Sequence, residues 1–204
     1  MNTGFRSRKI TTEQTGHNLW EYMLVAYPDG PVGDQVLMEK KYFFDEYREQ
    51  LSARTLPYIT IAYFMAKEEM EETLMRWIQR VCSSRESFVA TLNNFSGFPP
   101  HTIYLRVQDP QPFRQLAKEL HVIDGFVQSN GCPPVTLVTS PCLPIAGRLP
   151  QEVYEKAIAD YSGRIFHASF VVNELVLMKR RSQYDPSAQV SIFRLPPGPK
   201  DIYN

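Results

Sequence analysis

The 204-residue sequence has few cysteines and no long apolar run. Its three cysteines, Cys82, Cys132 and Cys142, are too few and too scattered for a disulfide framework, and no CxxC pair offers the spacing of a metal site. No stretch approaches the roughly 20 apolar residues that a membrane helix needs. No apolar signal-peptide core follows the polar N-terminus. We therefore expect a cytoplasmic protein with no membrane partner, metal or other cofactor.

An excess of either charge is also lacking, because 22 Lys and Arg residues balance 22 Asp and Glu residues. No net field would attract nucleic acid or an anionic membrane, so any anion site must be local. The sequence contains no Walker-type loop, GxGxxG, GxSxG or HExxH motif. What remains is a globular chain that is 43% apolar and 12% aromatic.

The apolar pattern predicts alternating strands and helices in both halves of the chain. In the first half we expect strands at 19–27, 56–64 and 87–93 and helices at 36–51 and 68–82. In the second half we expect strands at 102–107, 142–146, 165–178 and 189–195, with helices near 109–120 and 150–161. A turn-rich loop (NFSGFPPH) follows residue 93, and a loop of about twenty residues precedes residue 142.

Each half thus runs strand, helix, strand, helix, strand. This order predicts an α+β fold of two duplicated lobes, with antiparallel sheets around a central cleft. We expect a flexible tail over 1–17 and a single bilobal domain over 18–195, with lobes at about 18–100 and 101–195. Residues 196–204 form the expected C-terminal tail.

The order of elements and the sequence of residues 56–64 (LPYITIAYF) resemble those of the two-histidine phosphoesterase superfamily. This superfamily includes 2′-5′ RNA ligase-like proteins and cyclic nucleotide phosphodiesterases. In each lobe of that family a strand carries His, an apolar residue, Thr or Ser, and another apolar residue. Here Tyr58-Ile59-Thr60-Ile61 stands at the first motif, and Cys142-Leu143-Pro144-Ile145 stands at the second by element order. The segment 87–107 (SFVATLNNFSGFPPHTIYLRV) also resembles the family's strand, loop and next strand. Both motif histidines are replaced.

The resemblance implies that the missing histidines would act as acid and base on a phosphate ester, while the hydroxyl residues hold phosphoryl oxygens. Strand alternation puts Thr60 on the face of Tyr58, together with Ala62 and Phe64, and puts Ile59, Ile61 and Tyr63 on the other face. Tyrosine, with a pKa of about 10, donates a hydrogen bond at neutral pH but is a poor proton acceptor. Cys142 is a weak donor, and Pro144 has no hydroxyl. We therefore predict a degenerate site without catalytic residues.

Two arginines and a tyrosine extend the candidate binding site. Arg148 follows the second motif position, where members of the family often have a basic residue. Arg106 shares a strand face with Thr102 and Tyr104. Either arginine suits a phosphate group, and a plain surface position is the alternative for both.

Two histidines and a basic run are further candidate functional groups. His167 shares a strand face with Ser169, which allows a position in the cleft or a solvent-facing one. Alternation places His101 on a buried face. The run 179–181 (KRR) suits either RNA contact or a solvated hairpin tip, and we favour the tip.

Three functions remain open. The first is a diverged, non-catalytic 2′-5′ RNA ligase-like protein that binds a nucleotide or RNA phosphate in the interlobe cleft. The second is an active phosphodiesterase or ligase on RNA ends or cyclic phosphates that uses His167 or a water molecule. The third is a protein-interaction scaffold whose cleft is filled by side chains. The substrate-binding candidates of the first function are Tyr58, Thr60, Tyr104, Arg106, Cys142, Arg148 and His167.

Overall fold

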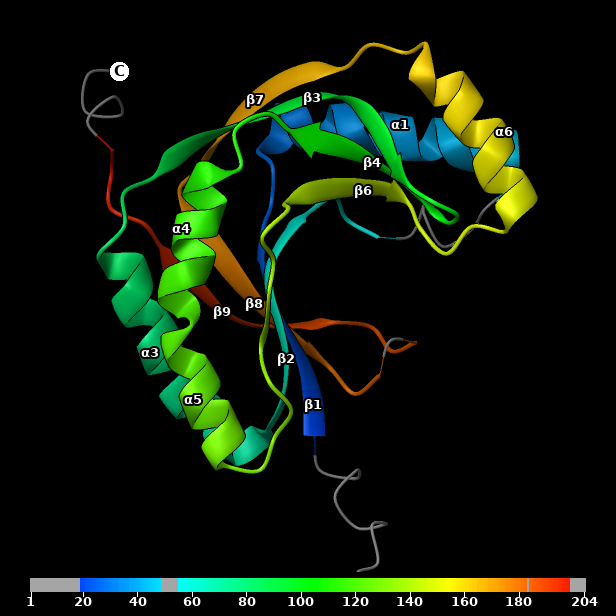
Figure 1. Ribbon diagram of the computed structural model, residues 1–204. Coiled ribbons are helices and arrows are strands. Elements are labelled where there is room, and N and C mark those ends of the chain that lie inside the picture. The colour runs from blue at the N-terminus through cyan, green and yellow to red at the C-terminus, as the bar shows by residue number, and fades with distance from the viewer. Residues whose placement is uncertain (1–18, 49–54, 183, 199–204) are drawn as a thin grey trace, which may run out of the picture.

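The computed structural model describes residues 19–48, 55–182 and 184–198, which form two antiparallel sheets with helices packed against them (Figure 1). Sheet A has the strand order β5-β2-β1-β8-β9, and sheet B has the order β6-β4-β3-β7. The strands are β1 (Leu19–Ala26), β2 (Ile59–Lys67), β3 (Phe88–Phe98), β4 (Thr102–Val107), β5 (Thr136–Leu137), β6 (Cys142–Ala146), β7 (His167–Val172), β8 (Glu174–Arg180) and β9 (Ala188–Arg194). The helices are α1 (Gly30–Tyr47), η1 (Glu68–Met70), α3 (Glu71–Ser83), α4 (Gln111–Leu120), α5 (Val122–Ser129) and α6 (Gln151–Ser162).

The two sheets repeat one arrangement, because β2-β1-β8-β9 of sheet A corresponds to β6-β4-β3-β7 of sheet B. In each repeat a strand (β1 or β4) leads through a helix (α1 or α4) to a second strand (β2 or β6). The first helix of each repeat packs on the opposite sheet: α1 contacts β6 and β7, and α4 contacts β2. The predicted α+β fold of two related units is confirmed. Both sheets also contain strands from both halves of the chain.

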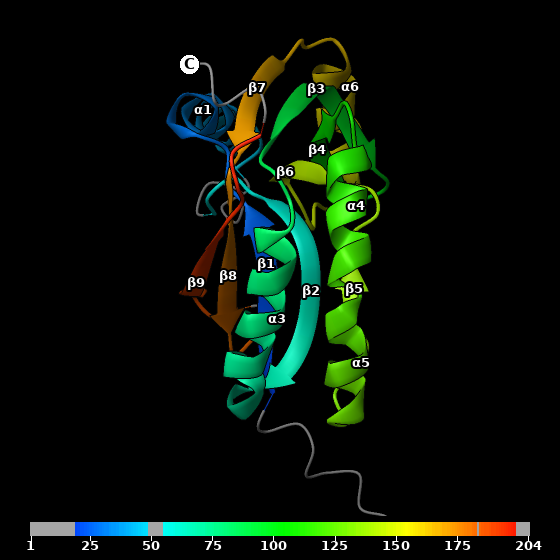
Figure 2. The same cartoon turned by 90° about the vertical axis from the view of Figure 1, so that its left-hand side faces the viewer.

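The covered faces of the two sheets share one apolar core. Figure 2 looks at the covered face of sheet A, with α3 in front of β1 and with α4 and α5 in one column beside β2. On the covered face of sheet B, the ring centroid of Tyr161 on α6 lies 4.7 Å from the ring centroid of Phe95 on β3 and 5.8 Å from that of Phe43 on α1. Gly97 of β3 lies so close to α6 that a Cβ there would collide with the Tyr154 hydroxyl.

A β-bulge in β2 corrects the predicted faces of this strand. Leu24 pairs with Ala62 and Val25 pairs with Thr60, so Ile61 is an extra residue between the two pairs. A bulge of one residue moves every later side chain to the opposite face. The prediction that Ala62 and Phe64 share the face of Thr60, and that Tyr63 lies opposite, was therefore wrong. Ala62 and Phe64 point into the core, and Tyr63 is half-exposed.

Residues 94–98 of the loop predicted after residue 93 belong to β3 instead, and only 99–101 form a turn. Asn94 adopts a left-handed conformation (φ 55°), and the pairing with β4 shifts there, from Leu92 with Val107 to Phe95 with Leu105. The Asn94 side chain accepts a hydrogen bond from the backbone N–H of Phe166. Asparagine tolerates this conformation better than most residues, so the strand continues through a turn-rich sequence.

The long connection before β6 is not a plain loop, because it contains α5 and β5. Ile123 and Val127, four residues apart, bury one side of α5, and Gly125 lies on this helix with open space around it. The predicted strand region 165–178 divides at Asn173 into β7 of sheet B and β8 of sheet A. Glycine and proline signals mark irregular backbone, but they do not exclude short elements that tertiary packing stabilises.

Helix α1 begins at Gly30, six residues before the predicted start, because Asp29 caps it. The Asp29 carboxylate accepts a hydrogen bond from the backbone N–H of Val32 at 3.1 Å. The expected tail 1–17, the end of the expected helix at 49–51, and residues 199–204 lie outside the described residues. Pro196 and Gly198 are both hydrogen-bonded to Ser87. Among the described helices, none is long and apolar enough to cross a membrane.

Candidate phosphate-binding site

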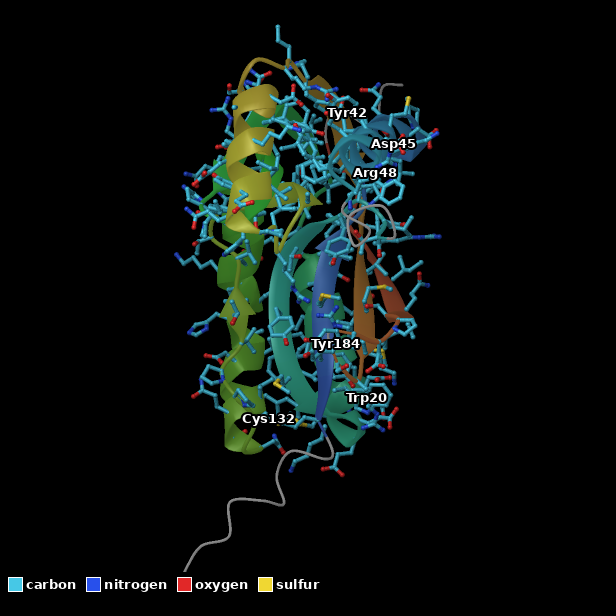
Figure 3. The ribbon with its side chains drawn as sticks, turned by 90° about the vertical axis from the view of Figure 1, so that its right-hand side faces the viewer. Trp20, Tyr42, Asp45, Arg48, Cys132 and Tyr184 are labelled. Carbon is cyan, nitrogen blue, oxygen red and sulfur yellow. The ribbon has the colours of Figure 1, made fainter. Side chains whose placement is uncertain are left out.

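The first motif strand presents Tyr58 and Thr60 on the face of sheet A that lacks α3, α4 and α5; Figure 3 views this face. Tyr58 directly precedes β2, and its ring meets Tyr27 edge-on at 6.0 Å between centroids. Both tyrosines pack over a small buried cluster formed by Met23, Val25 and Val176. Burial, and then the neighbouring Tyr58, raises the pKa of the Tyr27 phenol. The Tyr27 phenol therefore remains protonated at neutral pH and offers a donor.

Thr60 is half-buried and lies opposite Val25 in the β1–β2 ladder. Within residues 19–48, 55–182 and 184–198, the Thr60 hydroxyl has no hydrogen-bond partner. A threonine hydroxyl is both donor and acceptor, so this group is available to an incoming ligand.

The second motif strand, β6, is the edge strand of sheet B, and its residues pair with β4. Cys142 lies opposite Arg106, and Pro144 lies opposite Tyr104. Burial raises the pKa of the Cys142 thiol to about 11. The thiol is therefore protonated at neutral pH and cannot serve as a base there. The exposed Pro144 side chain supplies no polar atom.

Tyr104 and Arg106 point outward from β4 together with Thr102. The Tyr104 ring stacks on Phe98 of β3, with centroids 4.3 Å apart and planes 23° from parallel. The Arg106 Nε donates a hydrogen bond of 3.3 Å to the carbonyl of Asn93. Phe98 and Asn93 were not among the predicted site residues. Strict alternation past residue 93 would have put Phe98 on the covered face, because the bulge at Asn94 reverses the pattern.

The strands that carry the two motifs, β2 and β6, contact each other where the sheets meet (Figure 1). Strand β5 pairs with β2, and the chain then runs directly from β5 into β6. The backbone N–H of Val138, in this short link, donates to the carbonyl of Ile61, the bulged residue of β2. In the internal repeat, β2 and β6 occupy equivalent positions.

The remaining candidates lie farther from this junction. Arg148 is exposed in the bend after β6, in a left-handed conformation (φ 60°). His167 is exposed at the start of β7, opposite Asn93. Strands β4 and β3 separate β7 from β6, so His167 is three strand spacings, about 14 Å, away from the second motif strand. The structure therefore does not bring His167 next to Cys142.

Two expectations about basic residues were wrong. His101 is exposed in the turn before β4, with its Nδ1 3.0 Å from the Thr102 hydroxyl, rather than on a buried strand face. Lys179 and Arg180 belong to β8 rather than to a solvated tip. Lys179 pairs with Glu68 and Glu71 at 2.9 and 2.8 Å, and Arg180 pairs with Glu21 at 2.7 Å. Lys179 and Arg180 thus already form ion pairs with carboxylates of the same chain.

The family model of the 2′-5′ RNA ligase superfamily matches residues 37–183. The chain belongs to this superfamily. A comparison with curated protein sequences finds no match. Among solved structures, the chain is similar to apo E. coli LigT, with 14% identity, a TM-score of 0.58, and coverage of 87% of this chain and 98% of that chain. It is similar to E. coli LigT complexed with 3′-AMP at 13% identity and a TM-score of 0.60, with the same coverage.

A structure described as a phosphoesterase is similar at 14% identity and a TM-score of 0.56, covering 89% of this chain and 99% of that chain. At these identities the similarity concerns the fold. The expected membership of the two-histidine phosphoesterase superfamily is confirmed. The assignment of Tyr58 and Cys142 to the motif positions for histidine, and of Thr60 and Pro144 to those for the hydroxyl residue, stays a prediction. Among the described residues, no group of His, Cys, Asp and Glu is arranged to hold a metal ion.

Proposed function

We propose that this superfamily member binds the phosphate of a nucleotide or RNA at the junction of β2 and β6 and does not turn it over. The observation that carries this proposal is the unpartnered Thr60 hydroxyl on the same face as Tyr58, beside a second motif strand with neither a base nor a hydroxyl. One half of the phosphate-binding arrangement remains, whereas the proton-transferring groups are absent.

The chemistry of the motif positions supports a binding role. Positioned acid and base groups each contribute about 10² to 10⁴ to a rate, so losing two removes about 10⁴ to 10⁸. The Cys142 thiol is protonated because burial raises its pKa to about 11. Phenol and hydroxyl groups still donate hydrogen bonds to phosphoryl oxygens, and Arg106 and Arg148 supply positive charge from β4 and from the bend after β6.

The choice of ligand class is supported by relatives of known structure, since E. coli LigT has been seen complexed with phosphate, 3′-AMP and ATP. In this proposal, one bilobal domain over residues 18–195 binds the phosphate in the reducing cytoplasm. All three cysteines are unpaired, which is consistent with that location.

A scaffold function is the second candidate. Tyr27 and Tyr58 pack over Met23, Val25 and Val176. They therefore occupy part of the face of sheet A that lacks α3, α4 and α5. A cleft filled in this way would leave no room for a phosphate.

Calorimetric titration with 3′-AMP tests the proposal. Thr60→Val keeps the shape of the side chain and removes its hydroxyl, so we expect affinity to fall roughly ten- to a hundredfold, the worth of a hydrogen bond to a charged group. Thr73→Val on α3, across sheet A from Thr60, is the matched control. No binding by the unaltered protein, or equal binding by Thr60→Val, would refute a phosphate site at this hydroxyl and favour the scaffold.

An RNA with a 2′,3′-cyclic phosphate end separates binding from catalysis. Mass spectrometry after metal-free incubation should show unchanged RNA with the protein and with its His167→Ala variant. Turnover that disappears in His167→Ala would instead establish an enzyme with a relocated catalytic group.

A further inference from the structure

In the described part of the chain the two sheets have four edge strands, and three of these edges carry features that hinder pairing with a further strand. Strand β5 is only two residues long. The short edge strand β6 contains Pro144. In β9, Val190 is an extra residue between Gln189 and Ser191, which both pair with β8, so this edge is bulged. Short edges, prolines and bulges are the means by which proteins avoid edge-to-edge association.

The fourth edge strand, β7, has none of these features. Its sequence, HASFVV, contains no proline and no Lys, Arg, Asp or Glu. Its pairing with β3 runs from Val172 to His167 without a register shift. The strand forms the outer border of sheet B (Figure 1). Strand β7 therefore offers a regular free edge to another strand.

The backbone of β7 presents the N–H and C=O groups of alternate residues at this free edge. On β3, the carbonyl of Thr91 accepts a hydrogen bond of 2.8 Å from the backbone N–H of Gln108, just after β4, so it points away from β7. Thr91 and Ser169 are thus a non-hydrogen-bonded pair, and the N–H and C=O of Ser169 point away from β3. The same alternation gives this orientation to His167 and Val171, two residues to either side.

These backbone groups are available for pairing. Within residues 19–48, 55–182 and 184–198, the N–H and C=O groups of His167, Ser169 and Val171 at the free edge have no hydrogen-bond partner. The free edge ends at Asn173, whose carbonyl already accepts a hydrogen bond from the N–H of Leu195. All three side chains are exposed, and that of Val171 is an apolar group with 39% of its surface exposed.

We propose that two copies of this chain pair through β7, antiparallel about a two-fold axis between their Ser169 residues. In this register Ser169 faces Ser169 of the second copy, and His167 faces Val171, so every free N–H and C=O group of the three residues becomes paired. A shift of two residues in either direction leaves one of the three unpaired. No like charges lie opposite each other, and the His167 side chain covers the exposed Val171. A second copy fits this edge because its free groups are symmetric about Ser169.

The pairing joins two copies of the four-stranded sheet B into one continuous sheet. A two-fold axis perpendicular to the sheet keeps the corresponding faces of both copies on the same side. Because β6 and β7 are opposite edges of sheet B, the two β6 strands lie at the far ends of the joined sheet and stay uncovered. The inference goes beyond the proposed function and does not depend on it.

Sedimentation equilibrium of the full chain tests the proposal. Between about 1 and about 300 µM we expect the mass to rise toward that of two chains. Ser169→Pro removes an N–H at the free edge and keeps the bonds to β3, because an edge strand tolerates proline where the N–H faces outward, so the mass should stay at one chain. Ile192→Pro is the matched control. The Leu195–Asn173 bond fixes the alternation of β9 and points the Ile192 N–H outward, so this variant should still dimerise.

Two further variants separate a lost interface from a damaged fold. Ser169→Lys sets two like charges opposite each other on the axis, so the dissociation constant should rise about tenfold or more, and less at high salt. Thr91→Lys, on the neighbouring strand, adds the same charge and loses the same Thr91–Ser169 hydrogen bond, and should have a much smaller effect. Ser169→Cys should form a disulfide-linked dimer on oxidation, because directly opposed Cα atoms about 5.5 Å apart are within reach of a disulfide.

Three results would overturn the inference. The first is the mass of a single chain at the highest concentration. The second is a dimer whose dissociation constant is unchanged in Ser169→Pro and in Ser169→Lys, which would place the interface elsewhere. The third is an equal loss in Ser169→Lys and Thr91→Lys, which would indicate a general effect of charge rather than a contact on the axis.

Discussion

Arg106 lies directly opposite Cys142 across the β4–β6 ladder, yet its Nε donates to the carbonyl of Asn93 on β3, the strand on the other side of β4. Burial raises the pKa of the Cys142 thiol to about 11. The position is therefore occupied by a neutral thiol, which neither accepts a proton at pH 7 nor binds an anion strongly.

This pKa predicts slow alkylation of Cys142. Its reaction with iodoacetamide should be slow at pH 7 and should accelerate as the pH approaches 11, because the thiolate is the nucleophile. Peptide mass spectrometry measures the rate, with Cys82 as an internal reference, since burial raises the pKa of that thiol to about 12. Labelling of Cys142 at pH 7 as fast as that of a free thiol would contradict the assigned environment.

Restoring the family's motifs should restore chemistry. The triple variant Tyr58→His, Cys142→His, Pro144→Thr returns both histidines and the second hydroxyl to equivalent strands. We expect metal-free opening of an RNA 2′,3′-cyclic phosphate at least about 10²-fold faster than with either single histidine variant. Adding Thr60→Val should reduce that gain. A folded triple variant without turnover would show that the two strands no longer converge on one phosphate.

Gly97→Ala should destabilise the fold by about 1 to 3 kcal/mol, because the added methyl group meets the Tyr154 hydroxyl and the end of Ile158. Tyr154→Phe removes the nearest atom, so the double variant should recover part of the loss in urea unfolding. Gly125→Ala on α5 is the control: with open space around it, the change should be neutral or stabilise by up to about 1 kcal/mol. Equal effects at both glycines would contradict the close approach of β3 and α6.

Lys40 should give the stability a distinct pH dependence. Burial lowers the pKa of this lysine to about 8, against about 10.4 for an unfolded lysine. Between these values the unfolded chain binds the extra proton, so the stability of the protein relative to Lys40→Met should rise with pH in this window. Urea unfolding of both proteins from pH 7 to pH 10.5 measures the difference. A flat difference would mean that Lys40 titrates normally when folded.

The sequence was sufficient to predict the order of the main elements. Apolar alternation identified β2, and the family resemblance placed Cys142 and Pro144 on β6. The bulges at Ile61 and Asn94 were not predictable, because each depends on the register with a partner strand, β1 for Ile61 and β4 for Asn94. The exposed pair of Phe98 and Tyr104 was missed for the same reason, since a loop was expected where β3 continues.

The ion-pair partners of the basic residues also could not be predicted from the sequence. Lys179 finds Glu68 and Glu71 more than a hundred residues away, and only the fold brings them together. The basic run therefore looked solvent-exposed, although the charges of Lys179 and Arg180 are paired with carboxylates.

The exchange of α1 and α4 between the two sheets has a consequence for how such a protein is assembled. Residues 19–100 alone would supply α1 without the β6 strand that it contacts, and would leave β2 without α4. Neither half is a self-sufficient folding unit, and a single-repeat ancestor would have needed two copies that swap their first helices, as in a helix-exchanged homodimer. Two fragments cut between β3 and β4 should accordingly remain unstructured apart and complement each other when mixed.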